Sequence, residues 1–201
     1  MLLGIVLLSI SVFAAPLYAG ENDAAASALA ALLADTRNMQ AEFSQRVASD
    51  QGELLEESAG KMAFQRPHQL RWEINEPYRY LVLTNGETLW RYDPDFEQLS
   101  TESFTSVAQT PMLILAASAA SLSEQYQIGE VGDTFTLKPL AKQVEFTQLA
   151  LSFKGRALTK MLLTDNLGQQ TEIRLRNTQI NIGTLADSLF VFEQSTVGHE
   201  Q

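Results

Sequence analysis

The sequence predicts a mainly β protein built around one large, curved antiparallel sheet of ten or eleven strands. Apolar and polar residues alternate in many short segments, which is typical of strands with one buried face. Turn-forming pairs separate these segments at close spacing. Helical signals are confined to one region near the N-terminus and to residues 106–126, so most strands follow one another directly.

The first residues are typical of a secretory signal peptide and are set apart from the fold. Leu2–Phe13 is an uninterrupted apolar run, and small residues follow it up to Ala19. The run is short for a membrane span, although an uncleaved anchor is the alternative, since the usual opening Lys or Arg is missing. We expect cleavage after Ala19, a periplasmic location and a single domain over residues 20–201.

Composition excludes several classes of function. The formal net charge is −10, and such a balance repels the phosphates of nucleic acids. The chain contains no cysteine, which excludes disulfides, thiolate metal sites and lipidation of a cysteine. We therefore expect a soluble monomer after cleavage, with no nucleic-acid partner.

The first predicted element after the signal is a helix from Asp23 to Asn38. Asn22 or Asp23 can cap it, and its alanines are strong helix formers. Leu29, Leu32, Leu33 and Thr36 share one stripe, which we expect to face the rest of the protein.

The strands are predicted from residues that repeat with a period of two. The apolar positions are Met62 and Phe64; Leu70, Trp72 and Ile74; Phe135 and Leu137; Leu149, Leu151 and Phe153; Ile173 and Leu175; and finally Phe190 and Phe192. The turns between strands are predicted at Asn85-Gly86, Asp93-Pro94-Asp95, Gly132-Asp133, Lys154-Gly155 and Asp165-Asn166-Leu167-Gly168.

Residues 106–126 interrupt the pattern of strands. Thr110-Pro111 is a helix start, and Met112–Ala117 follows without a polar residue. Ser121-Leu122-Ser123-Glu124 forms a capping box that opens a second short helix, which we expect to include Tyr126. A helix that is apolar all round must be covered on every side. It can lie over the open face of a curved sheet, or it can be an ordinary core helix.

Motifs of catalysis are absent from the sequence. It has no G-x-S-x-G elbow, no P-loop, no Rossmann glycine pattern and no H-E-x-x-H. The two histidines, His68 and His199, do not suggest a metal site. Asp93 and Asp95 flank a proline and indicate a turn rather than a calcium loop. We expect a protein that is not an enzyme and that uses no metal or other cofactor; a hydrolase with an unrecognised site is a minor alternative.

The run from Gly60 to Trp72, followed by Pro77 and by Thr84–Asp95, resembles the LolA family, the periplasmic carriers of outer-membrane lipoproteins. Further matches to the family are Phe43-Ser44-Gln45, Thr110–Leu115, Asp165–Thr171 and Phe190-Val191-Phe192. The resemblance covers almost the whole chain after the signal, in order. It departs at the C-terminus, where the residues after Phe192 lack the proline that is frequent in relatives, and this puts a role of that segment in doubt.

The resemblance implies an incomplete antiparallel β-barrel, closed by a short helical lid over a hydrophobic cavity that receives acyl chains. Arg66 matches the arginine that holds the lid shut by hydrogen bonds to its backbone. The residues expected to form the cavity and lid are Phe43, Met62, Phe64, Leu70, Trp72, Leu89, Trp90, Met112, Leu113, Ile114 and Leu115. We also expect Leu70 and Trp72, beside Met112–Leu115, to form an uncovered apolar rim for docking.

The resemblance also implies a function and partners. A periplasmic chaperone of this family accepts triacylated lipoproteins released from the inner membrane by the ABC transporter LolCDE and carries them to the outer-membrane receptor LolB. The sequence contains no nucleotide site, so the energy for loading must come from such a transporter. The alternative is a periplasmic regulatory domain that senses lipids or lipoproteins with the same open barrel.

Overall fold

The computed structural model describes residues 18–104, 114, 122–141 and 145–193, which form one eleven-stranded antiparallel sheet with helical segments beside it. The expected ten or eleven strands are thus confirmed. The strands are β1 (Asn38–Ala48), β2 (Leu54–Gln65), β3 (Gln69–Glu76), β4 (Tyr80–Asn85), β5 (Thr88–Asp93), β6 (Gln98–Ser103), β7 (Tyr126–Val131), β8 (Thr134–Pro139), β9 (Phe146–Lys154), β10 (Ala157–Asp165) and β11 (Gln170–Ile180). The helices are α1 (Tyr18–Asp35), α2 (Leu122–Gln125) and the 3₁₀ helix η4 (Asp187–Phe190).

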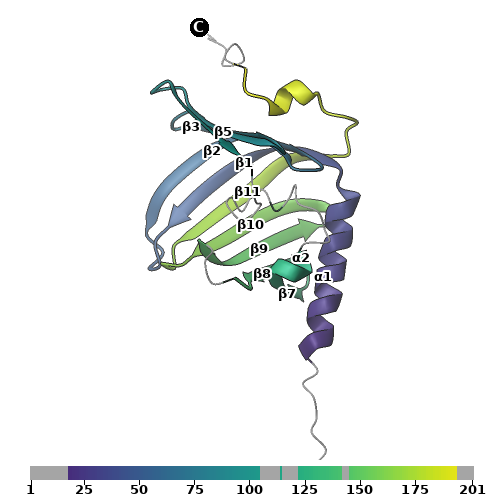
Figure 1. Cartoon of the computed structure of the whole chain (residues 1–201). Helices are drawn as coiled ribbons and strands as arrows, with labels where there is room; N and C mark the ends of the chain where they lie inside the picture. Colours follow the sequence, from purple (N-terminus) through teal and green to yellow (C-terminus); the bar gives the residue numbers. More distant parts are fainter. Residues whose placement is uncertain (1–17, 105–113, 115–121, 142–144, 194–201) are drawn as a thin grey trace, which may run out of the picture.

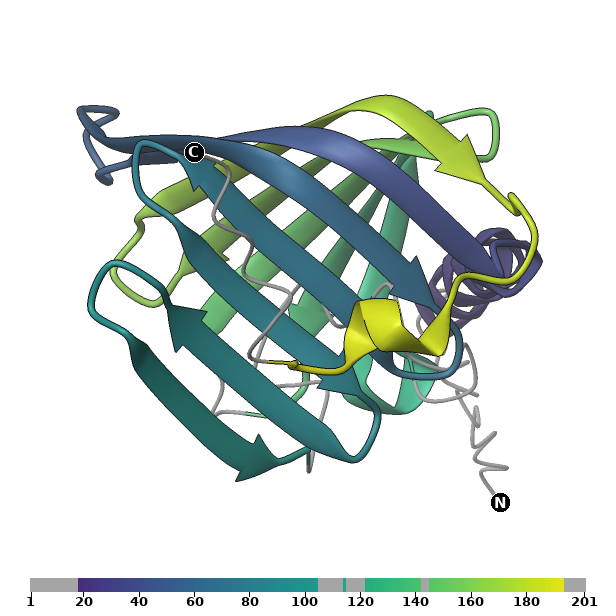
Figure 2. The same ribbon diagram turned by 90° about the horizontal axis from the view of Figure 1, so that it is seen from above.

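The sheet consists of two meanders that join at its centre. The strand order is β6-β5-β4-β3-β2-β1-β11-β10-β9-β8-β7. β1 therefore pairs with β11, and this pair joins the meander β1–β6 to the meander β7–β11. β6 and β7 form the two edges, and the sheet curls without closing (Figures 1 and 2). This is the curved sheet that the residue patterns predicted and the incomplete barrel that the resemblance implied.

The N-terminal helix has different limits from those expected. α1 spans Tyr18–Asp35, so it begins before the expected caps and ends three residues before Asn38. A single glycine in its first turns costs only about 1 kcal/mol and does not stop it. It ends early because Asn38 is already the first residue of β1, opposite Gln65 of β2. The stripe is confirmed, since Leu29 and Leu33 are buried and Leu32 is partly buried.

The predicted turns are confirmed where hairpins reverse. In the β4–β5 turn, Asn85 Oδ1 accepts hydrogen bonds from the backbone N–H groups of Glu87 and Thr88, and Gly86 has a φ of 95°. Only glycine adopts such a conformation without strain. Asx turns of the same kind stand at Asp93 and Asp165, as their short acceptor side chains predict.

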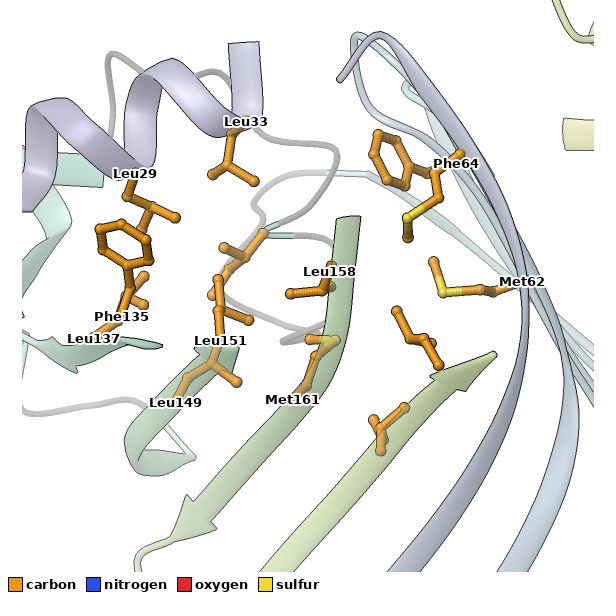
Figure 3. Close-up of a cluster of buried hydrophobic side chains, with 14 of the residues drawn as sticks. Leu29, Leu33, Met62, Phe64, Phe135, Leu137, Leu149, Leu151, Leu158 and Met161 are labelled. Carbon is orange, nitrogen blue, oxygen red and sulfur yellow. The ribbon is translucent and has the colours of Figure 1, made fainter. Parts of the chain in front are cut away.

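The core lies between the two halves of the curled sheet and under α1. Figure 3 shows Leu29 and Leu33 of α1 above Phe135, Leu137 and Leu151, with Met62 and Phe64 on the opposite half of the sheet. The face of each strand that contributes to this cluster is called the inner face below. Because side chains alternate along a strand, the neighbouring positions point to the outer face.

Two expectations are wrong, one near the C-terminus and one in the helical region before β7. Phe190 and Phe192 do not belong to a strand: Phe190 ends η4, and it is buried against the outer face rather than inside the barrel. The period of two does not mark a strand there, because Phe190 lies in a 3₁₀ helix and the extended backbone begins at Val191. Tyr126 begins β7 rather than continuing a helix, since it pairs with Pro139 of β8. A helix does follow at the predicted place, but it is the single turn α2, and the predicted cap Ser121 lies outside the described residues.

Candidate functional site

The interior of the curled sheet is lined by apolar side chains from both halves. On one half, Leu89, Leu70, Phe64 and Met39 lie in one row across β5, β3, β2 and β1. The buried Thr84 of β4 stands in the same row between Leu89 and Leu70. Other members of the core cluster on this half are Phe43, Met62, Trp72, Ile74 and Val82, and those on the other half include Phe135, Leu137, Leu149, Leu151, Leu158, Met161, Ile173 and Leu175. A surface of this composition can hold hydrocarbon.

The aromatic centre of this interior is a stack between two strands. The rings of Phe43 and Trp72 have centroids 3.8 Å apart, with planes inclined by 23°. Phe43 faces Gly60 across the β1–β2 ladder, and a Cβ at residue 60 would lie 2.9 Å from the Phe43 ring and 1.9 Å from the Glu73 carbonyl oxygen. The missing side chain therefore leaves the space that the ring occupies. An isolated glycine within a predicted strand is the sequence signal for such a close approach.

Arg66 lies at the C-terminal end of α1. Its Nε donates hydrogen bonds to the carbonyl oxygens of Leu33 and Thr36, both at 3.0 Å. Its backbone N–H donates to the carbonyl oxygen of Arg37. The last carbonyls of a helix lack partners within the helix and carry partial negative charge, so a guanidinium satisfies them well. Burial lowers the pKa of the Arg66 guanidinium from its ordinary value. Arg66 therefore ties the end of β2 to the end of α1.

The lid residues lie mostly outside the described part of the chain. Met112, Leu113 and Leu115, together with the helix start at Thr110-Pro111, are among the residues that are not described. Ile114 is described, and it is fully buried within the core cluster beside the sheet. At this position the chain between β6 and β7 reaches the apolar interior.

Three expected site residues need a different placement or role. Trp90 follows Leu89, which is buried in the core, so the alternation along β5 places Trp90 on the outer face. The expected uncovered rim at Leu70 and Trp72 is wrong, because these side chains are 0% and 2% exposed. Both belong to the buried core cluster of the inner face.

A C-terminal segment that sequence reasoning missed crosses the outer face. Residues 181–193 are called the strap; η4 in the strap packs against β3 and β4 (Figure 2). Asn38 holds its start, accepting from Ile182 N–H and donating to the Gly183 carbonyl oxygen. Phe190 is fully buried there, and the rings of Phe192 and Tyr92 lie 5.0 Å apart.

Between the strap and the sheet lies a groove of about 770 Å³ on the outer face. Its floor carries polar side chains of β1, β2 and β3, including Gln40, Lys61 and Arg71. Arg71 pairs with Glu73 at 2.7 Å, and this pair occupies part of the floor. The groove thus combines polar side chains of the sheet with apolar side chains of the strap, including Leu185 and Leu189.

The described residues offer little for metal chemistry or for membrane insertion by a helix. Among them, no three histidines or carboxylates are grouped so that they could hold a metal ion. None of the helices in the described ranges combines the length and the apolar character that a membrane crossing requires.

Comparison with known families gives a match over most of the chain. Residues 34–193 match the family described as "Outer membrane lipoprotein carrier protein LolA". A relative from Chromohalobacter salexigens, described as an outer-membrane lipoprotein carrier protein, is 36% identical over 185 residues, which are 90% of this chain and 88% of the relative. A carrier protein of the same description from Pseudomonas aeruginosa is 35% identical over 167 residues, or 80% of each chain.

Solved structures show the same fold at lower identity. A LolA superfamily protein from Nitrosomonas europaea superposes with a TM-score of 0.50 and 14% identity, covering 84% of this chain and 98% of that one. An uncharacterized conserved protein from Thermus thermophilus gives a TM-score of 0.51 and 11% identity, covering 85% and 93%. At these identities the structural matches describe the fold alone.

Proposed function

The chain belongs to the LolA family of outer-membrane lipoprotein carrier proteins, and from this membership we propose that it carries acylated lipoproteins across the periplasm with their acyl chains held in its apolar interior. The observation that carries the proposal is the inner face itself. Two halves of one sheet turn apolar side chains toward each other, and the edges β6 and β7 stay unjoined. An interior of this kind can open to admit a chain because no ladder of hydrogen bonds closes it.

A carrier is needed because acylated proteins do not leave membranes by themselves. Burial of a methylene group is worth about 0.8 kcal/mol, so one long acyl chain contributes on the order of ten kcal/mol to membrane binding. Three chains make spontaneous transfer through water negligible. A protein interior that buries the same chains exchanges one apolar environment for another, which makes transfer possible at small net cost.

The steps before and after transport follow from this energetics. We propose that an inner-membrane ABC transporter, LolCDE in this family, supplies the energy for loading triacylated lipoproteins, since the chain shows no nucleotide-binding motif. We propose delivery to an outer-membrane receptor, LolB. Residues 1–19 would direct export and be removed after Ala19, and the role itself requires no catalysis. The named relatives are carriers, which favours this function over a sensing domain.

Arg66 is proposed to couple the lid to this cycle. It already joins β2 to the end of α1, where hydrogen bonds to a charged donor contribute about 1.5–3 kcal/mol each. Contacts of that strength stabilise a closed, empty interior and can still be exchanged for the burial of an acyl chain. The proposed binding surface is the apolar inner face around Phe43, Met62, Phe64, Leu70, Trp72 and Leu89, with Ile114 and its neighbours.

The test is release of a purified triacylated lipoprotein from inner-membrane vesicles that contain the transporter. With ATP and the chain from Gly20 onward, we expect a soluble one-to-one complex; without ATP, the lipoprotein should stay with the vesicles. The carrier from Pseudomonas aeruginosa serves as the control for an active transporter. Failure to release cargo in a preparation where that control works would refute the proposed function.

A further inference from the structure

The two ends of the curled sheet differ in what they expose. At one end the chain reverses at residues 49–53, 77–79, 94–97 and 166–169, between β1 and β2, β3 and β4, β5 and β6, and β10 and β11. These four turns, with the first residues of the strands that follow them, are called the hairpin rim. α1 ends at the opposite end of the sheet, where β1 begins (Figures 1 and 2).

Large apolar side chains project from the hairpin rim. Phe96 and Leu167 stand at the tips of two turns and are 74% and 84% exposed. Leu54, Leu55, Tyr78 and Leu99 beside the turns are also exposed, and so is Leu140, which follows β8 at the same end of the sheet. At the opposite end, Val131 and Ile182 are the exposed large apolar residues of the described chain. Such a concentration at one end of a protein marks an interaction surface, whereas scattered single residues do not.

The turns hold the two most exposed apolar side chains of the hairpin rim in fixed positions. Asp93 Oδ1 accepts from the backbone N–H groups of Asp95 and Phe96, and Asp165 Oδ1 accepts from those of Leu167 and Gln169. Each Asx turn therefore fixes the backbone that carries the apolar residue. A side chain presented on a rigid turn loses little conformational entropy of the backbone on binding.

Contacts between the turns join them into one surface. The Tyr78 hydroxyl donates to Glu56 at 2.6 Å, which ties the β3–β4 turn to β2. Arg79 donates to Asp95 at 2.8 Å, which ties it to the β5–β6 turn. A Cβ on Gly168 would lie 3.1 Å from the Cβ of Asp50, so the β10–β11 and β1–β2 turns touch. The hairpin rim is thus continuous from Leu167 to Phe96.

The hairpin rim is strongly acidic. The β1–β2 turn and the start of β2 carry Asp50, Glu53, Glu56 and Glu57, and the β5–β6 turn carries Asp95 and Glu97. Within the four turns, Arg79 is the cation, and it is paired with Asp95. An anionic lipid surface would be repelled here, and so would the same rim of a second copy of this chain.

We propose that the hairpin rim is a docking surface for a partner protein that presents basic side chains around apolar pockets. Phe96 and Leu167 are the anchors that enter those pockets, and the surrounding carboxylates select the partner and orient its approach. This division follows the usual anatomy of interfaces, in which a few aromatic and aliphatic anchors carry the affinity and complementary charge carries specificity and association rate. The proposal rests on the proposed function in one respect: the partners available to a carrier are its transporter and its receptor.

The test measures binding of the full chain to two separate probes, the purified outer-membrane receptor and the detergent-solubilised transporter of the same bacterium. The double variant Phe96→Ser, Leu167→Ser is expected to bind at least one probe with an affinity about tenfold or more below wild type. The matched control Val131→Ser should bind as wild type does. Wild-type binding should also weaken as salt rises, because salt screens the carboxylates.

Several outcomes overturn the proposal. One is equal affinity of the double variant and wild type for both probes; another is no wild-type binding to either. A third is sedimentation of wild type, but not of the double variant, with phosphatidylethanolamine–phosphatidylglycerol vesicles, which would make a membrane the occupant. Release of cargo from vesicles is measured in parallel. If wild type releases no cargo, the carrier function is refuted. If wild type releases cargo and the double variant binds both probes as wild type does, the hairpin-rim proposal alone is refuted.

Discussion

The ring of Phe43 lies flat against the indole of Trp72, with centroids 3.8 Å apart, and it does so over a residue that has no side chain. The two aromatic residues come from β1 and β3, and Gly60 lies on β2 between them. The stack therefore spans three strands at the centre of the proposed acyl-chain surface. Its geometry depends on one glycine, which makes it open to a direct test.

Gly60→Ala should destabilise the fold by about 1–3 kcal/mol or more, because the new methyl group would meet the Glu73 carbonyl oxygen and the Phe43 ring. Urea unfolding, monitored by tryptophan fluorescence, measures the loss of stability. Gly129→Ala in β7 is the matched control, since a Cβ there meets nothing within 4 Å. Equal unfolding midpoints for the two variants would contradict the steric argument.

Phe190→Ala should cost about 3–5 kcal/mol of stability, the usual range for removing a buried aromatic ring, because Phe190 anchors the strap on the outer face. Thermal or urea unfolding measures it, and limited proteolysis should cut the strap first. Phe96→Ala, at an exposed tip, should change stability by no more than about 0.5 kcal/mol. A stable Phe190→Ala protein with a protected strap would show that other contacts hold the segment.

Arg66→Leu should leave the protein folded but slow the transfer of cargo to the receptor, because the closed, empty state loses hydrogen bonds to Leu33 and Thr36. Amide hydrogen exchange at the end of α1 should accelerate in the same variant. Arg174→Leu, on an exposed arginine paired with Glu172, is the control and should behave as wild type. Transfer at the wild-type rate by Arg66→Leu would disprove the coupling.

Tyr78 should lose its proton at a higher pH than an ordinary tyrosine. Its hydrogen bond to Glu56, followed by partial burial and the nearby negative charge, raises its pKa to about 12. Since the folded state favours the protonated phenol, the stability that this group contributes is present below pH 10 and is lost as pH rises toward 12. Glu56→Gln keeps an acceptor but removes the charge, and we expect the pKa to fall toward 10. Ultraviolet difference titration of the two proteins decides this.

Local patterns predicted much of the fold because strands and turns are local. The alternation at Leu70, Trp72 and Ile74 identified one buried face, since side chains of a strand point to opposite sides whatever the rest of the chain does. Asx turns at Asp93 and Asp165 were likewise readable, because a side chain that bonds to its own turn needs no distant partner.

The same patterns were insufficient at the C-terminus and at the surface. Phe190 and Phe192 alternate like a strand, but no neighbouring edge is available to pair with them, so they pack as a strap on the outer face of β3 and β4. Leu70 and Trp72 were expected at a rim but lie deep inside. A period of two shows which residues of a strand point to the same face of the sheet. It does not show which part of that face other elements cover.

The sequence by itself determined the class of fold, the turns, several of the apolar residues on the inner face and the family to which the chain belongs. Only the tertiary structure decided that Arg66 reaches the end of α1 and that Phe96 and Leu167 share one acidic rim. The reason is physical: alternation and turn chemistry act over a few residues. Covering a face, meeting a helix end or bringing turns together depends on how eleven strands curl and pair over the whole chain.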